Sequence, residues 1–510
     1  MKLRDAKSLA ELTGGSLVVG TGQLIGPDVV IDSRLTTPGA LFVALPGERV
    51  DGHDFVVAAA RLGAGAALVE RAVPVEISQI VVPDVLAALS AFATSEVAAA
   101  KARGLVTFAL TGSSGKTTTK DLLADICASV APSVSPVNSF NNQIGVPVTA
   151  ALITEDTRYL VSELGASHVG EIARYAQIVQ PHIAAVLNIG TAHLGEFGSR
   201  ENIAAAKAEI VQELSATDWA IFNAADEYAE QMARSTTAQV GWFGGKHADA
   251  ALAVRYRDLE FDAFERPKFT LYGWTPEAKF EVDVSMRLVG AHQVDNACAA
   301  AAMALAAGIE PEVIATSLSQ STPRSAHRMA LHTLDSDITL IDDCYNANPG
   351  SVGVAINVLA SIDMTRSDER AAGLGRTIAV LGDMLELGDE SAALHHQAGV
   401  EAGEAGLDVL IAVGEFAPDI VAGFEEGFAR SLRAARASVG ESGGATNAVI
   451  DAKLARRRPG VLAKSKSEIQ GLLELQPGDV VLLKASRGVG LETVVDALIE
   501  QFGRRGQSER

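Results

Sequence analysis

Residues 105–120 read LVTFALTGSSGKTTTK, and the rest of the chain is organised around this stretch. It begins with a short apolar run that includes β-branched residues, as a buried parallel strand does. Gly112 and Gly115 then let the backbone turn tightly, Lys116 adds a positive charge, and three threonines begin a helix whose first amides are free. The stretch therefore predicts a loop that binds phosphate groups.

The glycine pattern is G-x-x-G-K-T, a shorter form of G-x-x-x-x-G-K-[ST], because Leu110 stands where the first glycine of the longer form would be. The alternative interpretation is a glycine-rich turn that carries a solvent-facing lysine. Strand, turn and helix start follow one another in the order that a phosphate loop needs, which favours the phosphate loop. The candidate phosphate-binding residues are Gly112, Ser113, Ser114, Gly115, Lys116, Thr117 and Thr118.

Length and charge limit the kind of protein this is. A chain of 510 residues is too long for one hydrophobic core, so we expect two to four domains. Hydrophobic residues make up 48% and charged residues 21%, as in ordinary globular proteins. The net charge of −21 repels polyanions, which argues against nucleic acid as a partner and requires a local site for any phosphorylated ligand.

The cysteines and the apolar runs indicate a cytoplasmic protein. Cys127, Cys298 and Cys344 have neither the number nor the spacing of a disulfide framework or a zinc site, which is typical of a reducing cytoplasm. Charged residues interrupt the N-terminus, so it does not resemble a signal peptide. The longest apolar run, at 297–307, is half the length of a membrane span and reads as a buried helix. We expect no membrane insertion.

Three α/β segments are predicted, at 1–104, 105–322 and 323–510. The second alternates short apolar runs with alanine-rich helical stretches, which indicates a mostly parallel sheet flanked by helices. The third shows strands that end in polar loops and are separated by helices, as in a doubly wound, Rossmann-like sheet. It has no phosphate loop of its own, so its strand ends are expected to contribute to a shared cleft.

Polar side chains at strand ends of the second segment are candidate metal ligands. Glu163 follows an apolar run at 159–161, and His193 follows another at 183–187. Ligands of open α/β sheets bind at the carboxyl ends of strands, so both residues are expected near the phosphates held by Lys116. A carboxylate and an imidazole, with a hydroxyl from Thr117, suit a Mg²⁺ ion. Taken singly, a histidine in such a place is more often structural.

Lys207 lies on an otherwise apolar helix face, where lysine is seldom found without a reason. The alternative is a side chain that snorkels to solvent, and spacing alone does not decide between the two. His292 and Asn296 precede the alanine-rich helix, and we expect them either to cap it or to face a nucleotide.

Taken together, the motifs resemble the Mur ligases of bacterial cell-wall synthesis, over nearly the whole chain. The first segment resembles the family's module for a UDP-sugar, with Ser33, Arg34, Asp51 and His53 as the implied substrate-binding residues. In the second segment, residues 112–118 resemble the family's ATP loop. Asn141 and Asn142 resemble its substrate-facing loop, and His292 with Asn296 resembles the element that lies beside the nucleotide. Lys207 falls where the family carries a carbamylated lysine, whose anionic oxygens ligate Mg²⁺.

The third segment is the most specific. DDCYNANP at 342–349 and LGDMLELG at 381–388 resemble the branch that adds D-alanyl-D-alanine to UDP-N-acetylmuramoyl-tripeptide. The implied substrate-binding residues here are Asn346, Asn348, Lys484, Ser486 and Arg487. Ala485 departs from the usual K-G-S-R run of that branch, which bears on the contacts to the dipeptide and leaves the reaction class unchanged. Arg328 and Asp343 are candidates for closing the third domain over ATP.

The resemblance implies an ATP-dependent amide ligase. The γ-phosphate of ATP would move to the tripeptide carboxylate, and the dipeptide amine would attack the acyl phosphate to give the pentapeptide precursor of peptidoglycan, ADP and phosphate. The implied catalytic residues are Lys116, Glu163, His193 and Lys207, and the implied magnesium ligands are Thr117, Glu163, His193 and carbamylated Lys207. The enzyme is expected to act as a monomer.

Three alternatives remain open from the sequence. One keeps the chemistry but adds the third amino acid to the UDP-sugar dipeptide. A second is a folate polyglutamate ligase, which would lack the UDP-binding segment. The third is a different class, a phosphate-loop regulatory or motor ATPase, which would hydrolyse ATP without an amine acceptor.

Overall fold

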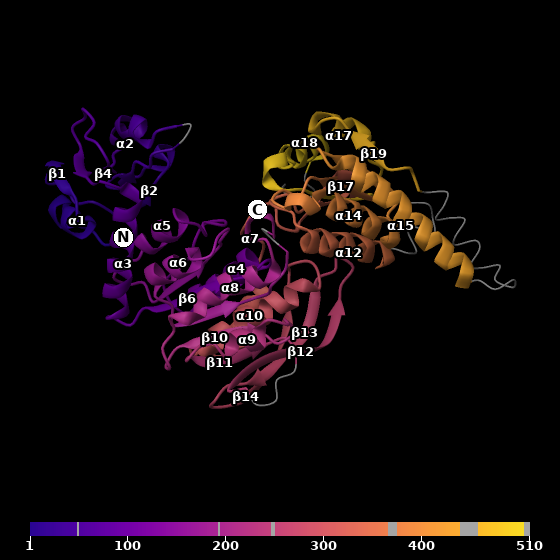
Figure 1. Cartoon of the computed structure of the whole chain (residues 1–510), viewed down its shortest axis with the longest axis horizontal. Helices are drawn as coiled ribbons and strands as arrows, with labels where there is room; N and C mark the ends of the chain where they lie inside the picture. Colours follow the sequence, from indigo (N-terminus) through magenta and orange to yellow (C-terminus); the bar gives the residue numbers. More distant parts are fainter. Residues whose placement is uncertain (48–49, 192–193, 246–249, 366–374, 439–456, 504–510) are drawn as a thin grey trace.

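The computed structural model describes residues 1–47, 50–191, 194–245, 250–365, 375–438 and 457–503. His193, the expected magnesium ligand, lies outside the described residues. The chain forms three α/β parts in sequence order, with the first (indigo) and the third (orange to yellow) at opposite ends of the view and the second (magenta) between them (Figure 1).

The first part is built on a five-stranded sheet with the order β1-β5-β4-β3-β2. β1 runs antiparallel to β5, and the other neighbours are parallel. Its elements are α1 (Ala6–Thr13), β1 (Ser16–Val19), β2 (Val29–Val30), β3 (Leu41–Val43), α2 (Val56–Arg61), β4 (Ala66–Val69), β5 (Ser78–Val81) and α3 (Val85–Lys101).

The second part has a nine-stranded sheet with the order β14-β13-β12-β11-β10-β9-β6-β8-β7. Its strands are β6 (Val106–Thr111), β7 (Ser133–Val134), β8 (Tyr159–Glu163), β9 (Ile183–Val186), β10 (Trp219–Asn223), β11 (Gln239–Phe243), β12 (Leu252–Phe261), β13 (Pro267–Trp274) and β14 (Lys279–Ser285). Its helices are α4 (Lys116–Val130), α5 (Gly145–Ala151), α6 (Glu171–Val179), α7 (Leu194–Phe197), α8 (Arg200–Gln212), α9 (Ala229–Ala233), α10 (His292–Ala306) and α11 (Pro311–Gln320).

The third part has a six-stranded sheet with the order β15-β16-β20-β17-β18-β19, in which only the edge strand β15 runs antiparallel to its neighbour among the described pairs. Its strands are β15 (Ala330–Thr333), β16 (Thr339–Asp342), β17 (Thr377–Gly382), β18 (Val409–Val413), β19 (Val461–Ala463) and β20 (Val480–Lys484). Its helices are α12 (Pro349–Thr365), α14 (Ser391–Ala405), α15 (Ala417–Ser438), α17 (Lys466–Leu473) and α18 (Glu492–Phe502).

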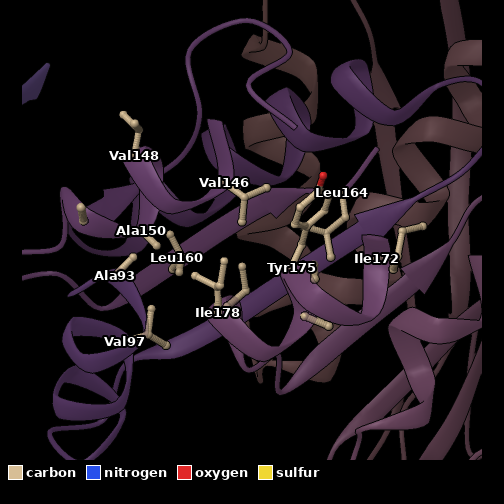
Figure 2. Packing of buried hydrophobic residues seen from close by; sticks show 14 of the residues in the cluster. Ala93, Val97, Val146, Val148, Ala150, Leu160, Leu164, Ile172, Tyr175 and Ile178 are labelled. Atoms are coloured by element: carbon tan, nitrogen blue, oxygen red, sulfur yellow. The ribbon is translucent and has the colours of Figure 1, made fainter. Parts of the chain in front are cut away.

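The first and second parts share one hydrophobic core. Figure 2 shows Ala93 and Val97 of α3 near Ala150 of α5 and Ile178 of α6, with Val146 of α5 farther along the same cluster. All of these side chains are buried, and one cluster runs from Met1 to Trp242. Because each buried aliphatic side chain of valine size or larger contributes about 1.5–3 kcal/mol, this core fixes α3 against the central part.

The predicted α/β class with mostly parallel sheets is confirmed. The expected buried helix at 297–307 corresponds to α10, which ends at Ala306 with Ala307 as its C-cap. The antiparallel strands β13 and β14 were not anticipated. β13 alternates buried with less buried residues, the pattern of an antiparallel strand with one solvated face. No strands are predicted from the sequence at residues 267–285, and the expected mostly parallel sheet leaves room for them. No helix among the described residues is long and apolar enough to cross a membrane.

Candidate active site

The predicted phosphate loop joins β6 to α4. Gly115 adopts a left-handed conformation with φ 76°, directly before the first turn of α4. A Cβ atom on Gly115 would lie 2.4 Å from Oδ1 of Asn296, so α10 packs against the loop at a position that only glycine fits. A Cβ on Gly112 would similarly lie 2.9 Å from Cβ of Leu187. The local sequence and the neighbouring elements therefore impose the same loop conformation.

The end of β9 holds the loop from the other side. The amides of Ser113 and Ser114 donate to Oδ1 of Asn188, at 3.0 and 2.9 Å. Lys116 Nζ donates to the carbonyl of Gly112 at 2.8 Å. Burial lowers the pKa of Lys116, while the carboxylate of Glu163 opposes that shift. An anion bound in the loop would offer this half-buried ammonium a stronger partner than a neutral carbonyl.

Glu163, at the end of β8, has one satisfied and one unsatisfied oxygen. Oε1 accepts hydrogen bonds from Asn141 Nδ2 at 2.6 Å and from Ser139 Oγ at 3.2 Å. Oε2 is buried and makes no hydrogen bond in the described part of the chain. The hydroxyl of Ser139 also lies 2.7 Å from Oγ1 of Thr117. A buried carboxylate oxygen without a donor, beside hydroxyls and a phosphate loop, suits a hard cation.

Lys207 projects from α8 and is 3% exposed. Among the described residues, no carboxylate is within ion-pair distance of it. Burial, with a smaller contribution from the charge of Lys116, lowers the pKa of Lys207 to about 7. Burial therefore favours the neutral amine, whose lone pair is available for reaction, at a lower pH than for an exposed lysine.

The first turn of α10 faces the loop. Asn296 Oδ1 accepts a hydrogen bond of 3.3 Å from Thr119, and its Nδ2 donates to Gln293 at 2.9 Å. Burial lowers the pKa of His292 to about 4, so the imidazole is neutral at pH 7. Nδ1 of His292 is buried and makes no hydrogen bond with the described residues.

The third part supplies the opposite wall. Arg328 Nη2 donates to Ser139 Oγ at 3.0 Å, and the guanidinium lies 4.1 Å from the ring centre of Tyr345. Asp343 Oδ1 accepts from the amide of Met329 at 3.1 Å, and Oδ2 accepts from Lys484 Nζ at 2.5 Å. These contacts bring the strand ends of β16 and β20 to the phosphate loop.

The elements enclose a cleft of about 640 Å³. Of the described site residues, those that line it are Ser113, Ser114, Gly115, Lys116, Thr117, Thr118, Asn141, Asn142, Glu163, Lys207, His292, Asn296, Arg328, Asp343, Asn346, Asn348 and Lys484. The structure thus brings together residues separated by nearly three quarters of the chain, as the sequence predicted for a shared cleft.

Two predicted dipeptide-binding residues stand behind this wall. Ser486 is buried, donates to the carbonyl of Ala347 at 3.3 Å and accepts from the amide of Leu385 at 2.9 Å. The guanidinium of Arg487 lies 5.0 Å from the ring centre of Tyr345. Neither residue is among the described residues that line the cleft, because their contacts hold the surrounding loops.

Ser33, Arg34, Asp51 and His53 lie in the first part, and the structure does not bring them to this cleft. Arg34 is exposed and pairs with Asp32 at 2.6 Å. His53 is buried: its Nδ1 lies 2.6 Å from Asp51, and its Nε2 accepts from the amide of Glu70 at 2.9 Å. The imidazole therefore stabilises the loop that carries Asp51 and joins it to the segment at Glu70.

Sequence reasoning missed Ser139 and Tyr345. Ser139 contacts the loop, Glu163 and Arg328, and Tyr345 stacks against two arginines. The only signal for Ser139 was its place two residues before the predicted loop pair Asn141-Asn142. Tyr345 stood within the quoted run at 342–349 without a role of its own.

This fold and this cleft belong to a known class of enzyme. Three family descriptions match the chain in succession, the Mur ligase family catalytic domain over 28–110, the Mur ligase middle domain over 110–304 and the Mur ligase glutamate ligase domain over 327–487. The chain belongs to the Mur ligase family.

Among its relatives, the UDP-N-acetylmuramoyl-tripeptide--D-alanyl-D-alanine ligase of Mycobacterium tuberculosis (strain CDC 1551 / Oshkosh) is 38% identical, over 96% of both chains. The enzyme of the same name from Escherichia coli (strain K12) is 33% identical, over 94% of this chain and 96% of its own. A crystal structure of MurF from Acinetobacter baumannii has a TM-score of 0.78 and 32% identity, covering 98% of this chain and 99% of its own.

Proposed function

We propose that this chain is the Mur ligase that uses ATP to add D-alanyl-D-alanine to UDP-N-acetylmuramoyl-tripeptide. The observation that carries the proposal is the identity to relatives with that activity in their names across all three parts. The enzyme transfers the γ-phosphate of ATP to the tripeptide carboxylate, and the dipeptide amine displaces phosphate from the acyl phosphate. The product is the UDP-linked pentapeptide used for peptidoglycan.

The phosphate loop binds ATP. Lys116 exchanges its contact with the Gly112 carbonyl for the migrating phosphoryl group, and the amides at the start of α4 point at the same anion. His292, neutral at pH 7, offers a polar nitrogen to the nucleotide without adding charge. Asn296 occupies the space beside Gly115, so a side chain at that position of the loop would collide with it.

The residues present fit Mg²⁺. The buried Oε2 of Glu163 has no donor among the described residues, Thr117 offers a hydroxyl and a carbamate on Lys207 would add anionic oxygens. His193 remains a proposed ligand from the sequence. When bound, the ion neutralises charge on the phosphates and on the acceptor carboxylate.

Lys207 is suited to carbamylation, because carbon dioxide reacts only with a neutral amine. Burial lowers its pKa to about 7, so the reactive form is abundant at neutral pH. The modification converts a buried cation near Lys116 into an anion, which removes one repulsion. A Lys207→Ala variant should lose turnover, and added bicarbonate should restore part of it. Full activity in Lys207→Arg with no bicarbonate effect in Lys207→Ala would contradict the carbamate.

The third part closes over the reactants. Arg328 stabilises negative charge on the phosphates. A carboxylate can accept about four hydrogen bonds, and Asp343 accepts two, from Met329 and Lys484, so it can also accept from ribose or adenine. We place the dipeptide near Asn346, Asn348 and Lys484, with Ser486 and Arg487 supporting that wall. We place the UDP group in the first part, near Ser33, Arg34, Asp51 and His53.

The linker after α11 is the proposed hinge. It is fastened to α4 by Arg324, which pairs with Asp125 at 2.9 Å, and by Ser325, which donates to Asp121 at 2.7 Å. We propose three domains, at 1–104, 105–322 and 323–510. We also propose that the protein acts as a monomer and that its domains close on binding the substrates. Scattering profiles should differ with and without an ATP analogue and the UDP substrate.

The deciding experiment is ATP-dependent phosphate release with UDP-N-acetylmuramoyl-tripeptide, with and without D-alanyl-D-alanine. We expect release to require both substrates and the product mass to be that of the pentapeptide. A Lys116→Met variant controls for contaminating ATPase. Release that needs a single amino acid and the UDP-dipeptide would identify the third-residue ligase instead. Release indifferent to both substrates would leave only a general ATPase.

A further inference from the structure

A second cluster of ligand-type side chains lies on the far side of β16 from the cleft. It comprises His327, His332, Asp342 and Cys344, and we call it the β15–β16 cluster. Successive side chains along an extended chain point to opposite faces. Asp343 lines the cleft, so Asp342 and Cys344 lie on the opposite face of the sheet, which the strand register shares with His332 of β15.

The cluster is compact. His327 Nδ1 lies 2.8 Å from Asp342 Oδ2, and Cys344 Sγ lies 3.0 Å from Asp342 Oδ1. The candidate ligand atoms of these three residues all lie within 4.8 Å of one another. His332 Nε2 is 3.6 Å from Asp342 Oδ2. With metal–nitrogen bonds of about 2.0–2.1 Å and metal–sulfur bonds of about 2.3 Å, tetrahedral zinc ligands are roughly 3.3–3.6 Å apart, so small side-chain shifts suffice.

The nitrogen Nε2 of His332 is buried, and its side chain is 15% exposed. Its neighbour Asp342 Oδ2 lies 3.6 Å away, beyond hydrogen-bond distance, so Nε2 makes no hydrogen bond with the described residues. Buried polar nitrogens are nearly always satisfied. The His327 side chain is 26% exposed, so an ion can reach the cluster from solvent. Two imidazoles, a thiol and a carboxylate are the ligand types of a tetrahedral zinc site.

We propose that the β15–β16 cluster binds one Zn²⁺ ion. The thiol and the second imidazole select a soft transition metal over the Mg²⁺ of the reaction, which prefers oxygen ligands. Binding releases the proton of Cys344, because the thiolate is the ligand.

The site is placed to control the wall of the cleft. His327 directly precedes Arg328 and has a φ of 61°, a backbone conformation that residues other than glycine seldom adopt. Its carbonyl accepts a hydrogen bond of 3.0 Å from the amide of Tyr345, the residue after Cys344. An ion that joins His327 to Cys344 therefore ties the segment of Arg328 to the segment of Tyr345, which stabilises the third part.

The test uses Co²⁺, whose bond to a thiolate gives a charge-transfer absorption that carboxylate and imidazole sites lack. Chelator-treated, full-length protein is titrated with Co²⁺ in excess Mg²⁺ and without nucleotide. We expect one equivalent to produce the band, Zn²⁺ to remove it, and a pH indicator to record proton release. Zn²⁺ should also raise the unfolding temperature.

Cys344→Ser should lose the band, whereas the matched control Cys298→Ser, which alters another buried cysteine, should keep it. His332→Gln keeps the thiol and should weaken Co²⁺ binding by at least about tenfold. If Cys344→Ser does not fold, the Co²⁺ affinity of His332→Gln decides whether the site exists. A wild-type protein without the band, a band that persists in Cys344→Ser, or unchanged affinity in His332→Gln would overturn the site and would leave the ligase reaction unaffected.

Discussion

The guanidinium of Arg328 donates a hydrogen bond of 3.0 Å to the hydroxyl of Ser139, and this contact joins the third part of the molecule to the second. The same hydroxyl lies 2.7 Å from Thr117 in the phosphate loop and donates to Glu163 at 3.2 Å. One serine thus connects the loop, the carboxylate that suits a cation and the arginine of the closing domain.

Removing this connection should slow the reaction. Hydrogen bonds to charged groups are worth about 1.5–3 kcal/mol, so we expect kcat/KM to fall roughly tenfold to a hundredfold in Ser139→Ala and at least as far in Arg328→Met. Steady-state phosphate release measures both. The control is Arg430→Met, which removes an exposed arginine of α15 that lies 3.6 Å from Glu404, and it should change kcat/KM by about twofold or less. Equal losses in all three variants would contradict a special role for Ser139.

Gly115→Ala should abolish nucleotide binding. The new Cβ would approach Asn296 Oδ1 to 2.4 Å, in addition to the strain of a φ of 76°. Gly308→Ala is the matched control, because Gly308 has a φ of 77° and nothing lies within 4 Å of its Cβ position. Calorimetric titration with an ATP analogue should show binding in the control alone. Adding Asn296→Ala to Gly115→Ala should restore part of it.

Lys207→Met should stabilise the protein near pH 7 in buffer free of carbon dioxide. The folded pKa of Lys207 is lowered to about 7 from 10.5, so the unfolded chain binds more protons between these values and wild-type stability rises with pH there. The variant lacks this rise, so its free energy of unfolding at pH 7 should be higher than that of the wild type by on the order of a few kcal/mol. Denaturant unfolding across pH measures the difference.

Lys120 supplies the control for that experiment. It is equally buried but pairs with Asp121 at 2.6 Å and donates to the carbonyls of Pro136 and Asn138. Lys120→Met should therefore destabilise the protein, because it leaves these acceptors without a donor. Destabilisation by Lys207→Met at all pH values would mean that Lys207 has a partner in the folded state.

His292 should make the protein sensitive to acid. Its folded pKa is lowered to about 4 from 6.5, so the unfolded state binds more protons between these values and stability is lost as the pH falls through them. His292→Gln should lose less stability than the wild type between pH 6.5 and 4. His168→Gln, with a side chain 68% exposed, should behave as the wild type does. Parallel unfolding curves for all three proteins would contradict the buried, neutral imidazole.

The phosphate loop could be predicted because its information is local. The apolar run, Gly115 and the threonines specify strand, turn and helix within sixteen residues, and the structure places β6 and α4 there. Strand-end residues such as Glu163 and Lys484 could be placed at one sheet edge, since parallel strands all end on the same side. Ser139 could not be found this way, because its three partners come from distant segments.

By itself, the sequence determined the three α/β parts, the phosphate loop and the polar strand ends, since these follow from side-chain periodicity and from backbone conformations that neighbouring residues impose. Only the tertiary structure decided which of these residues meet. Packing of α10 on the loop excludes a side chain at Gly115, and burial without an ion-pair partner among the described residues lowers the pKa of Lys207. The return of β15 along β16 gathers the four residues of the β15–β16 cluster. Proximity and desolvation are properties of the folded chain, and they set the chemistry of each side chain.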